Sequence, residues 1–103
     1  MTTISTGGIA MTKATLKDYV SETCKYFDVT ADDVYSQVNN YKITSARHVI
    51  WYFMRFRFDM RLKEISELFN NRHTSTIIAG TDKAKKLYAK DIEIIDNKIK
   101  KPF

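Results

Sequence analysis

Residues 61–88 read RLKEISELFNNRHTSTIIAGTDKAKKLY, and this stretch decides the fold that the sequence predicts. Its first part, residues 61–69, has the spacing of a short helix with Leu62, Ile65, Leu68 and Phe69 inward. Asn70-Asn71 predicts a tight turn, because asparagine tolerates the left-handed backbone conformation. A second helix follows to about residue 89, with Thr74 or Ser75 as its N-cap. Helix, tight turn and helix together predict a helix-turn-helix.

The second helix has one predicted buried stripe, made of Ile77, Gly80 or Thr81, Ala84, and Leu87 or Tyr88. Glycine inside a helix costs roughly 1 kcal/mol against alanine. Gly80 therefore predicts that another helix approaches closely at this point.

The leading end of the second helix carries a guanidinium, an imidazole and three hydroxyls, from Arg72, His73, Thr74, Ser75 and Thr76. A recognition helix presents this end to base edges in the major groove of DNA. Arginine reads guanine with two hydrogen bonds, and the hydroxyl residues contact bases, phosphates or the thymine methyl group. Taken alone, Ser and Thr at a helix start are more often N-caps than DNA contacts.

Two elements are predicted near the start of the chain. A helix over residues 15–27, capped by Thr12 or Thr15, buries an apolar stripe of Leu16, Tyr19, Val20, Thr23 and Phe27. Residues 28–35 predict a turn and a short helix, in which Thr30 and Asp33 resemble a capping box.

The longest helix is predicted to start at Thr44 or Ser45, after a loop at Asn39-Asn40, and to end near residue 58. Its core stripe consists of Ala46, Val49, Ile50, Phe53 and Met54, while Arg47, Trp51 and Arg55 line up on another face. Residues 57–60 form a connection. A last helix starts at Asp91, buries Ile92, Ile95 and Ile99, and ends before Pro102.

The composition fits one small helical domain. The 103 residues suit a single compact unit, which we expect at 13–103 after a flexible leader at 1–12. Only three glycines and one proline disfavour a sheet with many tight turns, and 44% hydrophobic residues suffice for a core. The predicted fold class is all-α, a compact domain of five to six helices.

The charge distribution indicates a polyanionic partner. Lys and Arg number 17 against 12 Asp and Glu, which gives a net charge of +5. Residues 42–63 hold a single acid, Asp59, and six basic residues: Lys42, Arg47, Arg55, Arg57, Arg61 and Lys63. Such clustering is typical of nucleic-acid binding. We expect Lys63 to contact phosphate.

Other functional classes lack their signatures. Cys24 is the only cysteine, so we expect a reduced, buried thiol, a cytoplasmic protein and no metal site. His48 and His73 lack the neighbours of a catalytic group, so no enzyme is expected. No phosphate-binding glycine loop is present, so we expect no nucleotide and no other cofactor. The longest apolar run, residues 49–54, is too short for a membrane span.

Residues 13–100 resemble the C-terminal DNA-binding domain (domain IV) of the bacterial chromosomal replication initiator DnaA, in the Trp-repressor-like helix-turn-helix group. The family signature runs Ile-Gly-x-x-Phe-Gly-x-Arg-Asp-His-Thr-Thr-Val, and residues 65–77 read ISELFNNRHTSTI. Upstream, Pro-Arg-Gln-Val of the family corresponds to ARHV at residues 46–49, and residues 29–34 match its Val-x-x-Asp-Asp-Val segment.

The resemblance implies roles for individual residues. Arg47 matches an arginine that reaches into the minor groove, where a narrow groove attracts guanidinium. Arg72, Ser75 and Thr76 match the signature arginine and its two threonines. His73 and Thr74 stand where the family has the base-reading Asp and His. Loss of the acid is expected to raise non-specific affinity for DNA.

Together these features predict sequence-specific binding of double-stranded DNA in recognition of a replication origin or regulation of initiation, without ATPase activity. Replication proteins are a second class of partner that the resemblance implies. Two alternatives stay open. One is a phage or plasmid transcription regulator, and the other is a helical module that docks on a protein through its apolar faces.

Overall fold

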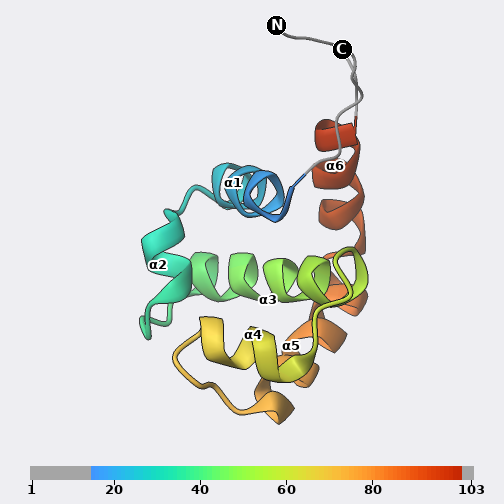
Figure 1. Ribbon diagram of the computed structural model, residues 1–103. Coiled ribbons are helices and arrows are strands. Elements are labelled where there is room, and N and C mark those ends of the chain that lie inside the picture. Colours follow the sequence, from blue (N-terminus) through green and yellow to red (C-terminus); the bar gives the residue numbers. More distant parts are fainter. Residues whose placement is uncertain (1–14, 101–103) are drawn as a thin grey trace, which may run out of the picture.

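Six helices make up residues 15–100, the part of the chain that the computed structural model describes (Figure 1). They are α1 (Leu16–Phe27), α2 (Ala31–Tyr35), α3 (Tyr41–Phe56), α4 (Leu62–Leu68), α5 (Thr74–Leu87) and α6 (Ala89–Lys100). The all-α fold with a helix-turn-helix at α4 and α5 is confirmed. The predicted leader at 1–12, the domain start at residue 13 and Pro102 lie outside the described residues.

Polar side chains determine where the first three helices begin. Thr15 and Asp18 form a reciprocal capping box on α1, and Thr30 and Asp33 form the predicted one on α2. The prediction that α3 starts at Thr44 or Ser45 is wrong. Asn40 caps α3 instead, because its side-chain oxygen accepts a hydrogen bond from the Ile43 amide at 2.9 Å.

Helix α3 is the centre of the molecule, with α1 on one side and α4 on the other (Figure 1). The predicted core stripe of Ala46, Val49, Ile50, Phe53 and Met54 is buried. Arg47 and Trp51, which were expected on another face, are also only 1% exposed. Helix α3 is therefore buried on more than one face, because α1, α2, α4 and α5 all pack against it.

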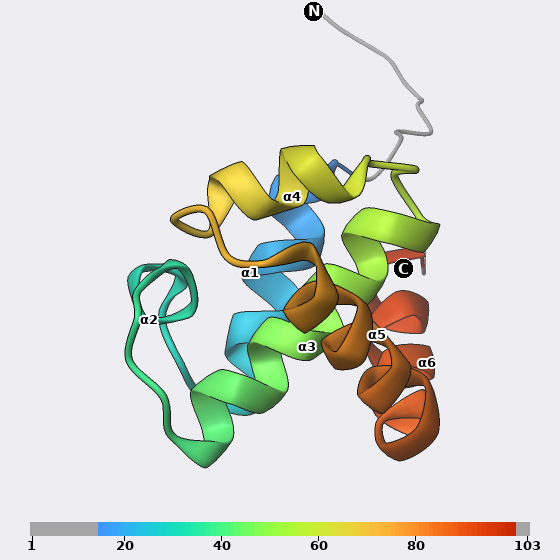
Figure 2. The ribbon, with the colours of Figure 1, turned by 90° about the horizontal axis from the view of Figure 1, so that it is seen from below.

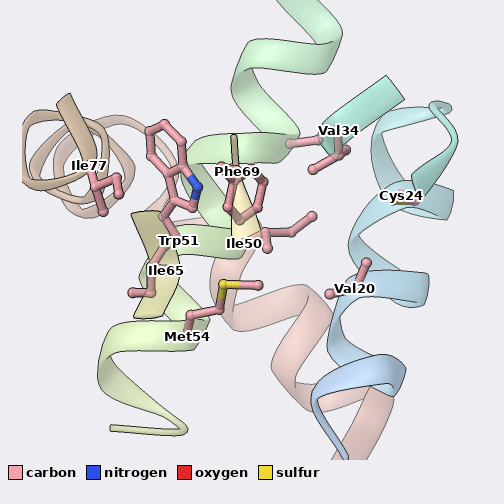
Figure 3. Packing of buried hydrophobic residues seen from close by; sticks show 10 residues of the cluster. Val20, Cys24, Val34, Ile50, Trp51, Met54, Ile65, Phe69 and Ile77 are labelled. Carbon is pink, nitrogen blue, oxygen red and sulfur yellow. The ribbon is translucent and has the colours of Figure 1, made fainter. Parts of the chain in front are cut away.

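Trp51 connects the helix-turn-helix to the core. Figure 3 shows its indole between Ile77 of α5 and Phe69, which follows α4. The Trp51 and Phe69 rings meet edge to face at 5.5 Å. Ile65 and Phe69 are buried as predicted, whereas Leu68 is 46% exposed and Leu87 is 64% exposed. These two leucines lie at helix ends, where the covering elements no longer reach.

A second buried cluster joins α1, α3 and α6, as Ile92 and Ile95 pack on Tyr19 and Phe53. The Tyr19 hydroxyl donates to Asp96 at 2.7 Å, and Arg57 forms an ion pair with the same carboxylate. Burial and this contact raise the pKa of Tyr19 above its usual value. Helix α6 begins at Ala89, two residues before the predicted Asp91. In residues 15–100 no helix is long and apolar enough to cross a membrane.

The predicted close approach at Gly80 is confirmed. A Cβ atom added there would lie 2.6 Å from Trp51 Cε3 and 2.8 Å from His48 Cδ2. Trp51 is 1% exposed and packs on Phe69, so its ring has little room to move away. Because Gly80 has no side chain, α3 and α5 can approach closely at this position.

We expect Gly80→Ala to lower the free energy of unfolding by about 1–3 kcal/mol, because overpacking displaces Trp51 and His48. Alanine favours a helix by about 1 kcal/mol, so strain has to exceed that gain. Urea unfolding measures the change. The matched control is Ala79→Gly at the exposed neighbouring position, where only the helix propensity of about 1 kcal/mol is lost. Stabilisation by Gly80→Ala would contradict the close packing.

Candidate nucleic-acid interface

The turn between α4 and α5 has the predicted left-handed backbone. Asn70 and Asn71 have φ values of 61° and 60°. The Asn71 amide donates to the Ser66 carbonyl at 2.8 Å, and the Ser66 hydroxyl donates to the Arg72 carbonyl at 2.5 Å. The Asn70 side chain donates to the Tyr35 carbonyl at 3.0 Å, which ties the turn to α2 (Figure 2). The turn is thus held from both sides, and it fixes the direction in which α5 leaves.

The start of α5 differs from the prediction by one residue. His73 is the N-cap residue, not Thr74 or Ser75, and its side chain makes no capping hydrogen bond. Thr74, Ser75 and Thr76 therefore lie inside the first turn, and all three are exposed. The hydroxyls are not consumed in capping the helix, and the first turn contains no acid. This end of α5 combines free polar side chains with the partial positive charge of a helix N-terminus.

Arg72 lies half-buried directly before this turn. Its guanidinium carbon is 5.9 Å from the centre of the Trp51 ring, and Nη2 donates to the Ser36 carbonyl at 3.4 Å. The Nε atom is buried and has no hydrogen-bond partner among the described residues. Trp51 thus supports Arg72 from below, a role that the sequence did not reveal. The sequence showed only that Trp51 lies four residues after Arg47, on a face of α3 away from the predicted core stripe.

Arg47 requires a correction. It is 1% exposed, so the predicted insertion into a minor groove does not fit its position. Its guanidinium donates to the Val34 carbonyl at 2.9 Å and to the Asn39 side chain at 3.0 Å. It also donates to the carbonyl of Asp33 in α2 at 3.3 Å, and to those of Ser36 and Val38 in the chain between α2 and α3 at 3.0 and 2.9 Å. Burial and the nearby Arg72 charge lower its pKa.

Basic side chains flank α5. Lys63 and Arg61 are exposed at the start of α4. On α5 the exposed lysines are Lys83, Lys85 and Lys86. Arg55 is less available, because it donates to the Thr81 hydroxyl at 3.0 Å. Exposed basic residues are therefore found at the start of α4 and on the later turns of α5, but not all six predicted basic residues are freely available.

His48 lies behind this face, against Trp51 with ring centres 5.5 Å apart. Burial, together with the nearby positive charges of Lys83, Arg47 and Arg72, lowers its pKa to about 4. The imidazole is therefore neutral at pH 7. A neutral ring in this position contributes packing between α3 and α5 and no positive charge to the interface.

Comparison with known proteins links this geometry to a family. A model described as "Bacterial dnaA protein helix-turn-helix" matches residues 17–84. Among curated relatives, the chromosomal replication initiator protein DnaA of Streptococcus thermophilus (strain ATCC BAA-491 / LMD-9) is 31% identical over 99 residues, which covers 90% of this chain and 22% of the relative. The protein of the same name from Clavibacter sepedonicus is 30% identical over 70 residues, with 68% and 15% covered. That from Acholeplasma laidlawii is 28% identical over 79 residues, with 74% and 18% covered.

Proposed function

The chain belongs to the bacterial DnaA helix-turn-helix family, and from that premise we propose that it binds a specific sequence of double-stranded DNA with α5 in the major groove. The observation that carries the proposal is the leading end of α5. Thr74, Ser75 and Thr76 are exposed there, are not used as caps, and follow the hydrogen-bonded turn at Asn70 and Asn71.

Two kinds of contact follow from this arrangement. His73, Thr74, Ser75 and Thr76 offer donors and acceptors of the size that base edges require. The amides of the first turn and the exposed Lys63 attract phosphate. Arg72 reaches a guanine from its position over Trp51, because its weak 3.4 Å bond to Ser36 is readily exchanged for a base contact. Arg47 acts from the interior by holding the segment that carries Ser36.

The biological process is proposed from the relatives. The chain spans about a fifth or less of the length of the curated relatives it matches. The name of these relatives supports a role in chromosomal replication initiation, at an origin or in its regulation, within the bacterial cytoplasm. The proposal assigns no catalytic step, no ATPase activity and no nucleotide to this domain. Contacts with replication proteins are a further part of it.

The decisive experiment is selection from a random duplex library at a fixed, stated salt concentration, followed by footprinting on genomic DNA. Enrichment of one sequence supports the proposal, and failure to retain any duplex overturns it. A footprint over a promoter instead of an origin would favour a transcription regulator. Capture of a protein with no mobility shift on DNA would favour an interaction module.

We expect Arg72→Ala to weaken binding to the selected site by about 1–3 kcal/mol with little change on random DNA, because it removes a base contact. Lys63→Ala is the contrasting variant. It removes one phosphate contact, so it weakens binding to all sequences alike and shallows the slope of log Kd against log salt by about 1. Salt-dependent mobility shifts measure both. Unchanged discrimination by Arg72→Ala would show that α5 is not the reading helix.

A further inference from the structure

The outward face of α5 becomes apolar after its first turn. Ile78 is 38% exposed, and Ala79 is exposed beside it. Because side chains four residues apart lie above one another on a helix, Ile78 follows Thr74 and Ala79 follows Ser75 on the same face. The buried side of α5, formed by Ile77, Gly80, Thr81 and Ala84, points the other way, onto α3.

The rest of the outward face is charged. Asp82, Lys83, Lys85 and Lys86 are all exposed on the later turns. The apolar pair thus lies between the hydroxyls of the first turn and these charged residues, which include three lysines that attract phosphate. A protein partner would cover an apolar surface with more apolar surface. Here the pair is too small for that and is surrounded by groups suited to nucleic acid.

In a duplex, the apolar feature at the edge of the major groove is the thymine C5-methyl group. We propose that Ile78 and Ala79 read thymine methyl groups in neighbouring base pairs, next to the pairs that Thr74 and Ser75 contact. The inference rests on the proposed function, since it requires α5 to lie in the major groove. It makes the second turn of α5 a specificity determinant that acts without hydrogen bonds.

Deoxyuridine tests the inference, because it differs from thymidine only by the missing methyl group. In the duplex chosen by selection, each thymine is replaced singly and Kd is measured at one salt concentration. Burial of one methyl group is worth about 0.8 kcal/mol. We therefore expect about a fourfold loss of affinity at one or two neighbouring thymines and none at the others.

Protein variants assign the effect to residues. Ile78→Ala favours the helix, so it is expected to fold, and it should abolish the deoxyuridine effect at one sensitive thymine. Ile94→Ala is the matched control, because Ile94 is similarly exposed, at 43%, but lies on α6. It should leave the effect unchanged. Ala79→Ser places a hydroxyl at the neighbouring thymine and should reduce the effect there.

The outcomes separate this inference from the proposed function. Specific binding without sensitivity to any deoxyuridine overturns methyl reading and leaves DNA binding in place. Full sensitivity retained in both Ile78→Ala and Ala79→Ser also overturns it, because another residue would then contact the methyl groups. Absence of binding to every duplex overturns both proposals.

Discussion

Arg47→Met is expected to lower the free energy of unfolding by about 3–5 kcal/mol, because several buried acceptors lose a charged donor and such hydrogen bonds are worth about 1.5–3 kcal/mol each. Methionine fills the space of the aliphatic stem, but it removes a donor from five oxygen acceptors. Four of them are backbone carbonyls of the segment between Asp33 and Val38. Two of these acceptors keep another donor, because Arg72 also donates to the Ser36 carbonyl and the Ser36 amide to the Asp33 carbonyl. Each buried acceptor left unpaired costs about 1–3 kcal/mol, and the cost is smaller where a water molecule can hydrogen-bond to the acceptor instead.

Urea unfolding of Arg47→Met and Arg55→Met distinguishes the effect of losing this hydrogen-bond network from the effect of losing one positive charge. Arg55 is half-buried on the same helix and, within residues 15–100, donates a hydrogen bond to Thr81 alone, so its replacement should cost about 1 kcal/mol. At temperatures where Arg47→Met stays folded, it should still bind DNA. Unchanged stability together with a large loss of DNA affinity would instead restore the minor-groove role that the family resemblance implied.

The helix-turn-helix was predictable because its signals are local. Leu62, Ile65 and Phe69 repeat at helical spacing, and two asparagines mark the turn whatever surrounds them. Gly80 was informative for the same reason, since a glycine inside a helix needs a packing partner. The start of α3 was missed because several residues in a row can cap a helix, and Asn40 competes with Thr44 and Ser45 only through the final geometry.

The environment of α3 was not predictable from periodicity. Spacing assigns side chains to faces, but it does not tell how many faces other elements cover. Arg47 and Trp51 share a face that the segment between α2 and α3 and the α4–α5 turn close off, and both depend on contacts far apart in sequence. The candidate site was predicted at residues 72–76 because the start of a helix is a local feature. Ile78 and Ala79 belong neither to the predicted buried stripe of α5 nor to its polar start, so the sequence pattern gives them no role.

The stability of the fold should depend on pH through His48. Its pKa in the folded protein is about 4, below the ordinary value of 6.5. Between about pH 6.5 and pH 4 the His48 imidazole is therefore largely protonated in the unfolded chain but neutral in the folded chain. Stability is then complete above 6.5 and falls as the pH drops to 4, by up to about 3 kcal/mol, because one pKa unit is worth about 1.4 kcal/mol.

The measurement is urea unfolding of the original chain and of His48→Gln at several pH values between 7 and about 4.5. The comparison separates the contribution of His48 to the pH dependence from that of the carboxylates. Asp18, whose pKa is lowered by its hydrogen bonds to Thr15, also loses stabilising interactions in acid, but it does so equally in both proteins. His48→Gln should therefore flatten the decline, whereas His73→Gln, at an exposed position, should keep it. If His48→Gln declined as steeply as the original chain, the imidazole would have to be protonated inside the fold. The contact of α3 with α5 would then carry a positive charge.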